Sequence, residues 1–276
     1  MTASTATKKR TVSAVRKSPA KAVHPRKFVW YDVMTTDVAA ASAFYSKVVG
    51  WTVADSGSEP TYLLLSAGPD MVGGIMPIPE EVRACGARPT WFGYIGVDDV
   101  DVYAKRVTKA GGKIHRAPRD IPGIGRFAVA SDPHGATFIL FTPKSGTEQR
   151  AAAPGSPDHV GWRELHAGDL DSAWKFYSGL FGWKKAVAMD MGAMGIYQTF
   201  ETGNTPGGGM MTKRPDTPAP FWLYYFNVDA IDAAAARVTA NGGRIIMGPH
   251  QVPGELWIVQ CFDPQGVMFA LLAAKR

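Results

Sequence analysis

The sequence predicts an α+β fold of four successive βαβββ modules, arranged as two similar units with mixed sheets. Three observations lead to this prediction. The 276-residue chain repeats itself in two halves, each half contains two rounds of strand, helix and three strands, and 46% of the residues are hydrophobic while 20% are charged. Such a composition is typical of a globular chain that can bury a core.

The repeat is clearest at the start of each half. The segment "FVWYDVMTTDVAAASAFYSKVVGW" begins at Phe28, and "VGWRELHAGDLDSAWKFYSGLFGW" begins at Val160. Identical pairs continue through both halves, and they include Trp30/Trp162, Asp37/Asp169, Phe44/Phe176, Tyr45/Tyr177, Trp51/Trp183, Tyr62/Tyr197, Trp91/Trp222, Asp98/Asp229 and Asp132/Asp263. This number of matches indicates a duplication. We therefore expect a first unit over 28–142, a linker over 143–158 and a second unit over 159–276.

Aspartate and glycine mark the helices of each module, because Asp favours helix N-caps and Gly favours helix ends. In the first unit, Asp37 precedes a helix expected over 38–49, and Asp98 or Asp99 precedes a helix expected over 100–111. The strands are expected over 28–34, 51–54, 61–68, 72–78, 91–97, 112–117, 126–131 and 136–142. The second unit follows the same order.

The positive charge of the chain is concentrated in residues 1–27. This segment holds eight of the 30 Lys and Arg residues and no acid, so the remaining residues carry 22 basic and 24 acidic side chains. The segment lacks aromatics and apolar periodicity, which predicts a disordered basic tail. Three roles stay open for it: a solvated tail, an arm that binds nucleic acid or another polyanion, and an organelle transit peptide.

Other features bear on the location of the protein. We expect neither a secretory signal nor a membrane partner, because no apolar stretch reaches the about 18–20 residues of a membrane span. The chain has only two cysteines, Cys85 and Cys261, which is too few for a disulfide scaffold and predicts a cytoplasmic protein. Cys261 lies in a strand-like run and is expected to be a small buried hydrophobe.

The chain after residue 27 resembles the vicinal oxygen chelate superfamily of glyoxalase I, bleomycin-resistance proteins and extradiol dioxygenases. The resemblance rests on the order of elements, on Asp37 to "FY" and "GW" in the first helix, on "VDDVD" at 97–101, and on "DPHG" and "DPQG" before the last strands. It is greatest to bacterial two-unit glyoxalase-like proteins, often labelled hydroxylases, whose units also open on Trp-x-Asp or Trp-x-Glu. The resemblance implies cup-shaped mixed sheets, and two units packed about a pseudo-twofold axis in a monomer or homodimer.

The same resemblance implies where metal ligands would stand. Counting from the motifs places them at Trp30 and Trp162, near Phe92 and Leu223, and at Ile139 and Ala270. None of these side chains is an imidazole or carboxylate, the groups that bind such divalent ions. We therefore predict no cofactor. A divalent metal in a rebuilt site around Glu164 and His166 stays open as an alternative.

The first strand of each unit supplies the candidate site residues. Side chains alternate along a strand, so Trp30, Asp32 and Met34 share one face, and Trp162, Glu164 and His166 share the equivalent face. If this face lines the cup, each cup holds an aromatic plate beside a carboxylate, which suits a flat or cationic ligand. Asp32, Glu164 and His166 are the catalytic candidates. The alternative is that both tryptophans fill the sheet core while Asp32 and Glu164 form salt bridges.

Loops and glycine clusters give weaker signals. Arg126 and Trp257 are candidate ligand contacts if the loops 120–126 and 251–257 form cavity rims, and they have no such role if these loops are ordinary hairpin connections. The "VGG" and "GGG" runs do not precede helices, so they do not fit phosphate loops, and we interpret them as bends or as close approaches of a ligand.

Three functions follow from these observations. The first is a metal-independent protein that binds a small organic ligand in its cups, for sequestration or for an unassigned conversion. The second is a metal-dependent lyase, isomerase or oxygenase that uses Glu164 and His166. The third is an accessory protein that binds a polyanion through residues 1–27.

Overall fold

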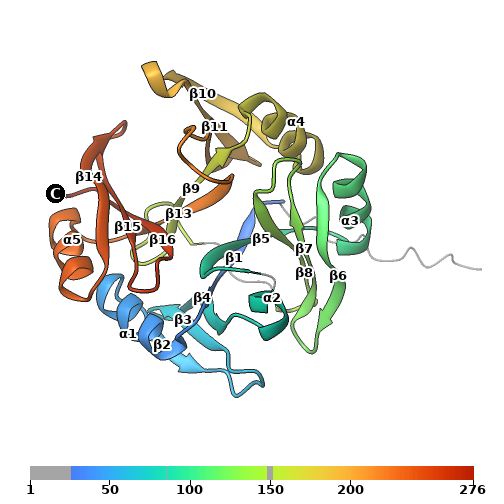
Figure 1. Cartoon of the computed structure of the whole chain (residues 1–276), viewed down its shortest axis with the longest axis horizontal. Helices are drawn as coiled ribbons and strands as arrows, with labels where there is room; N and C mark the ends of the chain where they lie inside the picture. The colour runs from blue at the N-terminus through green and yellow to red at the C-terminus, as the bar shows by residue number, and fades with distance from the viewer. Residues whose placement is uncertain (1–25, 85, 148–151) are drawn as a thin grey trace, which may run out of the picture.

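The computed structural model describes residues 26–84, 86–147 and 152–276, which form two eight-stranded mixed sheets (Figure 1). Most of the tail expected over 1–27 and the middle of the linker lie outside the described residues. The predicted α+β fold of four βαβββ modules in two units is confirmed, and the sheets are open rather than closed into barrels.

Each sheet joins two βαβββ modules along their first strands. The first sheet has the order β2 (Thr52–Asp55), β3 (Leu63–Ala67), β4 (Asp70–Pro77), β1 (Phe28–Thr35), β5 (Thr90–Gly96), β8 (Thr137–Pro143), β7 (Gly125–Ser131) and β6 (Lys113–Ile121). The second has the order β10 (Lys184–Asp190), β11 (Ile196–Thr202), β12 (Thr205–Thr212), β9 (Val160–Ala167), β13 (Phe221–Asn227), β16 (Met268–Ala273), β15 (Leu256–Phe262) and β14 (Arg244–Val252). The strands β1 and β5 pair antiparallel at the centre, as do β9 and β13.

The four longer helices begin where the sequence predicts. The helices are α1 (Val38–Val48), α2 (Glu80–Ala84), α3 (Val100–Lys109), α4 (Leu170–Phe181) and α5 (Ile231–Ala240), with a short 3₁₀ turn, η1 (Gly192–Met194). Asp37 caps α1 by accepting the backbone N–H of Ala40 at 2.9 Å. Of the two candidates, Asp99 caps α3, since it accepts the N–H of Val102 at 3.1 Å. The short α2 and η1 have too little periodicity to be predicted.

The two units share one hydrophobic core, because each places a helix against the other's sheet. Figure 1 shows α1 beside α5, and α3 beside α4. The hydroxyl of Tyr45, on α1, donates to Asp263 of the second unit at 3.1 Å and accepts from Trp91 Nε1 at 2.9 Å. The equivalent Tyr177, on α4, lies 3.5 Å from Asp132 of the first unit. The "FY" and "DPxG" motif residues therefore meet across the interface.

The tryptophans that end the first helix of each unit also cross the interface. Trp51 Nε1 donates to the carbonyl of Asp158 at 2.6 Å, and Trp183 Nε1 donates to the carbonyl of Arg26 at 2.7 Å. Each indole thus holds the chain segment that leads into the other unit.

Cys261 is fully buried in the shared core, which confirms that it acts as a small hydrophobe, and burial raises the pKa of its thiol to about 12. Within the described part of the chain, no helix has the length and apolar character needed to cross a membrane.

Candidate functional site

From Trp30 and Trp162 onward, after a register shift near the start of each strand, the first strand of each unit presents its even-numbered side chains to the face of the sheet that lies opposite the helices. On β1, Tyr31 and Val33 point into the shared core, so Trp30, Asp32 and Met34 lie on the other face, as alternation predicts. The tryptophan rings and Met34 are partly exposed, whereas Asp32 is buried. We call this face the first cup, and the equivalent face of the second sheet the second cup.

In the first cup, Asp32 is surrounded by hydrogen-bond donors of its own unit. Trp30 Nε1 and the Tyr62 hydroxyl donate to Asp32 Oδ1 at 2.8 and 2.7 Å, and the Tyr94 hydroxyl donates to Oδ2. Trp30 Nε1 also lies 2.9 Å from the Tyr62 hydroxyl. The neighbour of Asp32 is therefore not a salt-bridge partner, and both of its oxygens are occupied without a ligand.

Burial governs the protonation of this cluster. Desolvation raises the pKa of Asp32, while the hydrogen bonds from Tyr94, Tyr62 and Trp30 oppose the rise. Burial and the Asp32 carboxylate both raise the pKa of Tyr62 and of Tyr94, so the two phenols stay protonated and act as donors. Asp32 thus has a raised pKa, but both of its oxygens already accept hydrogen bonds from its own unit.

The second cup holds the same arrangement with an additional imidazole. The Tyr197 hydroxyl donates to Glu164 Oε2 at 2.9 Å, and the Tyr225 hydroxyl donates to Oε1 at 3.1 Å. Trp162 Nε1 donates to the Tyr197 hydroxyl at 2.7 Å, rather than to the carboxylate. His166 Nε2 lies 2.8 Å from Glu164 Oε1, so the structure brings these two predicted catalytic candidates into direct contact.

The His166 ring is held on two sides. It stacks on Phe221 with a centroid distance of 4.5 Å and an interplanar angle of 3°, and its Nε2 faces Glu164. When Nε2 carries the proton and donates it to Glu164, the lone pair lies on Nδ1, which has no hydrogen-bond partner among the described residues. A histidine in this state can accept a proton from a bound molecule.

Apolar side chains surround this polar cluster in the second cup. Leu223, Tyr225 and Ala270 form its buried floor, with half-buried side chains around them: Trp162, Phe221, Ile258, Met268 and Leu272. A half-buried apolar wall beside a few polar groups is typical of a small-molecule site.

Three of the positions at which the two cups differ give the second cup additional polar and aromatic groups. Gln260 Nε2 donates to the Tyr225 hydroxyl at 2.8 Å and so extends the polar cluster of the second cup. His166, Phe221 and Gln260 occupy the positions that Met34, Thr90 and Val129 hold in the first unit. The second cup alone therefore combines the carboxylate with an imidazole and an aromatic stacking partner.

The positions implied as metal ligands do not fit a metal ion. Phe92 pairs with Asp32 across β1 and β5, and Ile139 pairs with Tyr94 across β5 and β8, so both lie in the first cup with only carbon atoms to offer. Leu223 and Ala270 occupy the equivalent positions in the second cup. Within residues 26–84, 86–147 and 152–276, no three His, Cys, Asp or Glu side chains are grouped as a metal site would require.

Sequence reasoning missed the four tyrosines that bind the carboxylates. Tyr62 and Tyr197 were matched in the repeat but given no role, and Tyr94 and Tyr225 are matched at the same spacing as Trp91 and Trp222. Two tyrosines and one carboxylate recur together in both units, and this shared recurrence is the sequence signal that could have identified the tyrosines as partners of the carboxylate.

The last glycine of each cluster is explained by one of these tyrosines. A Cβ added to Gly74 would lie 2.1 Å from the Tyr62 hydroxyl and 2.7 Å from Asp32 Oδ1. A Cβ added to Gly209 would lie 2.2 Å from the Tyr197 hydroxyl. Glycine at both positions leaves room for the tyrosine that reaches the carboxylate.

The structure does not bring Arg126 or Trp257 to either cluster. Arg126 binds Asp101 of α3 at 2.7 Å and Asp120 at 2.8 Å, on the helix side of the first sheet. Trp257 packs against the shared core, and Arg276 lies over its ring at 5.0 Å. The loops that precede them form the hairpins β6–β7 and β14–β15.

Comparisons with known proteins identify a family model and several relatives that match most of the chain. A family model described as Glyoxalase/Bleomycin resistance protein/Dioxygenase superfamily matches residues 27–140 and 156–271. CFP32 of Mycobacterium tuberculosis, which carries the provisional name of a glyoxylase, is 31% identical over 246 residues, covering 88% of this chain and 93% of the relative. The anthracycline biosynthesis protein DnrV of Streptomyces peucetius is 30% identical over 262 residues, covering 90% and 93%.

Among solved structures, the Mn(II)-bound glyoxalase of Novosphingobium aromaticivorans superposes with a TM-score of 0.64 at 17% identity, covering 92% of this chain and 84% of that chain. A likeness at this identity concerns the fold alone.

Proposed function

Because the chain belongs to the glyoxalase/bleomycin resistance protein/dioxygenase superfamily, we propose that it binds a small, flat organic molecule in the second cup and that His166 accepts a proton from it. The contact between His166 and Glu164 carries this proposal, since it joins an imidazole to a buried carboxylate beside an apolar wall, and Nδ1 of that imidazole has no partner in the part of the chain that the structure describes. The ligand would lie against Trp162 and Phe221.

His166 and Glu164 have different roles in this proposal. Glu164 accepts three hydrogen bonds, from His166, Tyr197 and Tyr225, so its oxygens are used within the protein. Its negative charge faces the imidazolium that forms when Nδ1 takes a proton, and its hydrogen bond to Nε2 holds the ring with Nδ1 as the acceptor. Glu164 is therefore a positioning residue, and His166 is the group that touches the ligand.

The first cup supports binding at most. Asp32 is closed off by Trp30, Tyr62 and Tyr94, and Met34 stands where the second cup has His166. A thioether can pack against an aromatic ring but cannot accept a proton at neutral pH.

The relatives favour an aromatic ligand. DnrV of Streptomyces peucetius and DauV of Streptomyces sp. are both named as anthracycline biosynthesis proteins, and each covers 90% of this chain at 30% identity. A polycyclic ring system is a suitable partner for the stacking surface of the second cup.

The test uses the neutral dye 1,4-dihydroxyanthraquinone and follows its own visible fluorescence during titration with the full chain, with and without EDTA. Binding should be unaffected by EDTA and should weaken at least tenfold in His166→Ala and in Trp162→Phe. The matched changes Met34→Ala and Trp30→Phe alter the equivalent side chains of the first cup, and they should leave the affinity within about twofold. The tenfold loss expected in the second cup corresponds to about 1.4 kcal/mol of binding free energy.

Two results would overturn the proposal. Equal losses in both cups would show that His166 and Trp162 have no special part. Binding that EDTA abolishes would support the metal-dependent alternative at Glu164 and His166.

A further inference from the structure

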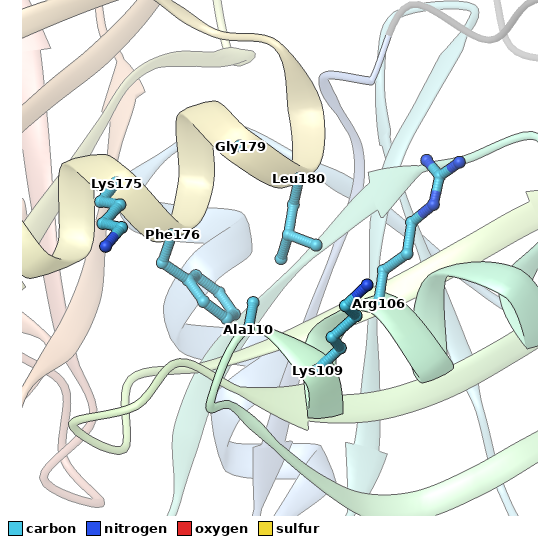
Figure 2. Close-up of a pocket in the computed structure, with 7 residues that line it drawn as sticks. All are labelled: Arg106, Lys109, Ala110, Lys175, Phe176, Gly179 and Leu180. Atoms are coloured by element: carbon cyan, nitrogen blue, oxygen red, sulfur yellow. The ribbon is translucent and has the colours of Figure 1, made fainter.

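A hollow of about 290 Å³ lies far from the cups, between a helix of each unit (Figure 2). The helix α3 of the first unit forms one wall and α4 of the second unit forms the other, with Phe176 and Leu180 pointing from α4 towards α3. The lining residues are Arg106, Lys109, Ala110, Lys175, Phe176, Gly179 and Leu180. We call it the α3–α4 groove.

The α3–α4 groove is strongly basic. Arg106, Lys109 and Lys175 line it, and no acidic side chain does. Among the described residues, none of these three cations has a carboxylate within ion-pair distance, and the Arg106 guanidinium instead lies 4.9 Å from the centre of the Tyr103 ring. Three cations around one hollow attract an anion, and an apolar floor strengthens that attraction by excluding water.

The duplication provides an internal comparison, because α1 and α5 meet at the equivalent place. There, Arg237 corresponds to Arg106, and it donates from Nε and Nη2 to the carbonyl of Val48 at 3.1 and 2.9 Å. Lys47 corresponds to Gly179, so that interface has a long side chain where the α3–α4 groove has none. The arginine that joins the units on one side is therefore available to a ligand on the other.

Gly179 has no structural reason to be glycine. It lies inside α4, where glycine costs about 1 kcal/mol relative to alanine. A Cβ added there would have no heavy atom within 4 Å, and the backbone does not adopt a left-handed conformation. The consequence of the missing side chain is that the groove stays open.

We propose that the α3–α4 groove binds a small organic anion with a flat apolar body, such as an aromatic carboxylate. Its charged group would lie among Arg106, Lys109 and Lys175, and its ring against Leu180 and Phe176. A volume of about 290 Å³ is at the small end of ligand sites, which favours a single ring over a polycyclic ligand. This site is independent of the function proposed for the second cup.

The test follows 4-fluorobenzoate by ¹⁹F NMR during titration with the full chain, using 4-fluorobenzamide as the uncharged probe. The native chain should bind the carboxylate at least tenfold more tightly than the amide. Gly179→Gln fills the groove with a neutral chain and should weaken binding of the carboxylate at least tenfold, and Lys175→Ala should weaken it severalfold. The controls Gly179→Ala, which leaves the groove open, and Lys47→Ala, at the equivalent interface, should bind as the native chain does.

Three outcomes would overturn the proposal: no binding of the carboxylate, equal binding by native and Gly179→Gln chains, or equal binding of acid and amide. Competition with inorganic phosphate separates a shaped site from general charge. Phosphate should displace the probe only weakly, and displacement as strong as that by benzoate would show that the apolar floor contributes nothing.

Discussion

Replacing Tyr45 with phenylalanine should destabilise the whole chain, because one hydroxyl connects three parts of the shared core. Tyr45 is completely buried, donates to Asp263 Oδ2 at 3.1 Å and accepts from Trp91 Nε1 at 2.9 Å. Tyr45→Phe keeps the ring and its packing. It removes only the two hydrogen bonds.

The size of the stability loss depends on which hydrogen bonds Trp91 and Asp263 still make after the hydroxyl is removed. A buried polar group left without a partner costs about 1–3 kcal/mol. Among the described residues, Trp91 Nε1 has no other partner and should lose the larger share. Asp263 loses the donor to Oδ2 but keeps the backbone N–H groups of Gln265 and Val267 on Oδ1, at 2.9 and 2.8 Å, and should lose less. The expected loss in the free energy of unfolding is about 2–4 kcal/mol.

Urea denaturation, followed by circular dichroism, measures this loss. Tyr177→Phe is the matched variant, with longer distances of 3.5 Å to Asp132 and 3.1 Å to Trp222, so it should lose less than Tyr45→Phe. The reasoning would be refuted by a loss below about 0.5 kcal/mol for Tyr45→Phe, which is the range of an ordinary surface change. A larger loss for Tyr177→Phe would also contradict it.

Three other predictions concern the first cup, the second cup and the tail. Burial raises the pKa of Asp32 above 3.8, so its contribution to stability is complete below about pH 4 and is lost as the pH rises through the raised value. The native chain should therefore lose stability relative to Asp32→Asn as the pH rises above about 4 in urea titrations, and a relative gain would contradict this. Gly209→Ala places a methyl group 2.2 Å from the Tyr197 hydroxyl and should lower the free energy of unfolding by about 1–3 kcal/mol. The control Gly179→Ala has no atom within 4 Å of the new methyl group and should raise the free energy of unfolding by up to about 1 kcal/mol. Equal thermal shifts in the two variants would refute the steric argument. Deleting residues 1–25 removes six Lys and Arg residues and leaves 24 basic and 24 acidic ones. In the full chain, a plot of log K for duplex DNA against log salt concentration should have a slope no steeper than about −5, because at most six phosphates are neutralised. The shortened chain should not bind the DNA. Unchanged binding after the deletion would rule out the tail as the contact.

The fold could be predicted because its sequence signals are local and each of them occurs in both units. A helix cap such as Asp37, a terminating glycine and strand alternation act within a few residues, and the repeat confirmed each of them. Local alternation also placed Trp30 and Asp32 on one face of β1 correctly, since the opposite face, with Tyr31, enters the core.

The polar clusters could not be predicted in the same way, because their members come from separate strands. Tyr62 lies 30 residues from Asp32, and Tyr94 lies 62 residues from it. Only the order of strands in the sheet brings them together. The face taken by Arg126 likewise depends on the register of the β6–β7 hairpin, which the residues of the loop do not reveal.

The fusion of two units into one chain has a consequence for how such a site can change. In a symmetric dimer of identical single units, every substitution occurs in both cups and at both helix interfaces. Here, histidine stands in one cup and methionine in the other, and Gly179 faces one interface while Lys47 faces the other. In the fused chain, a substitution can therefore change one cup or one helix interface while the equivalent one stays as it was. A symmetric homodimer of identical chains cannot acquire this asymmetry.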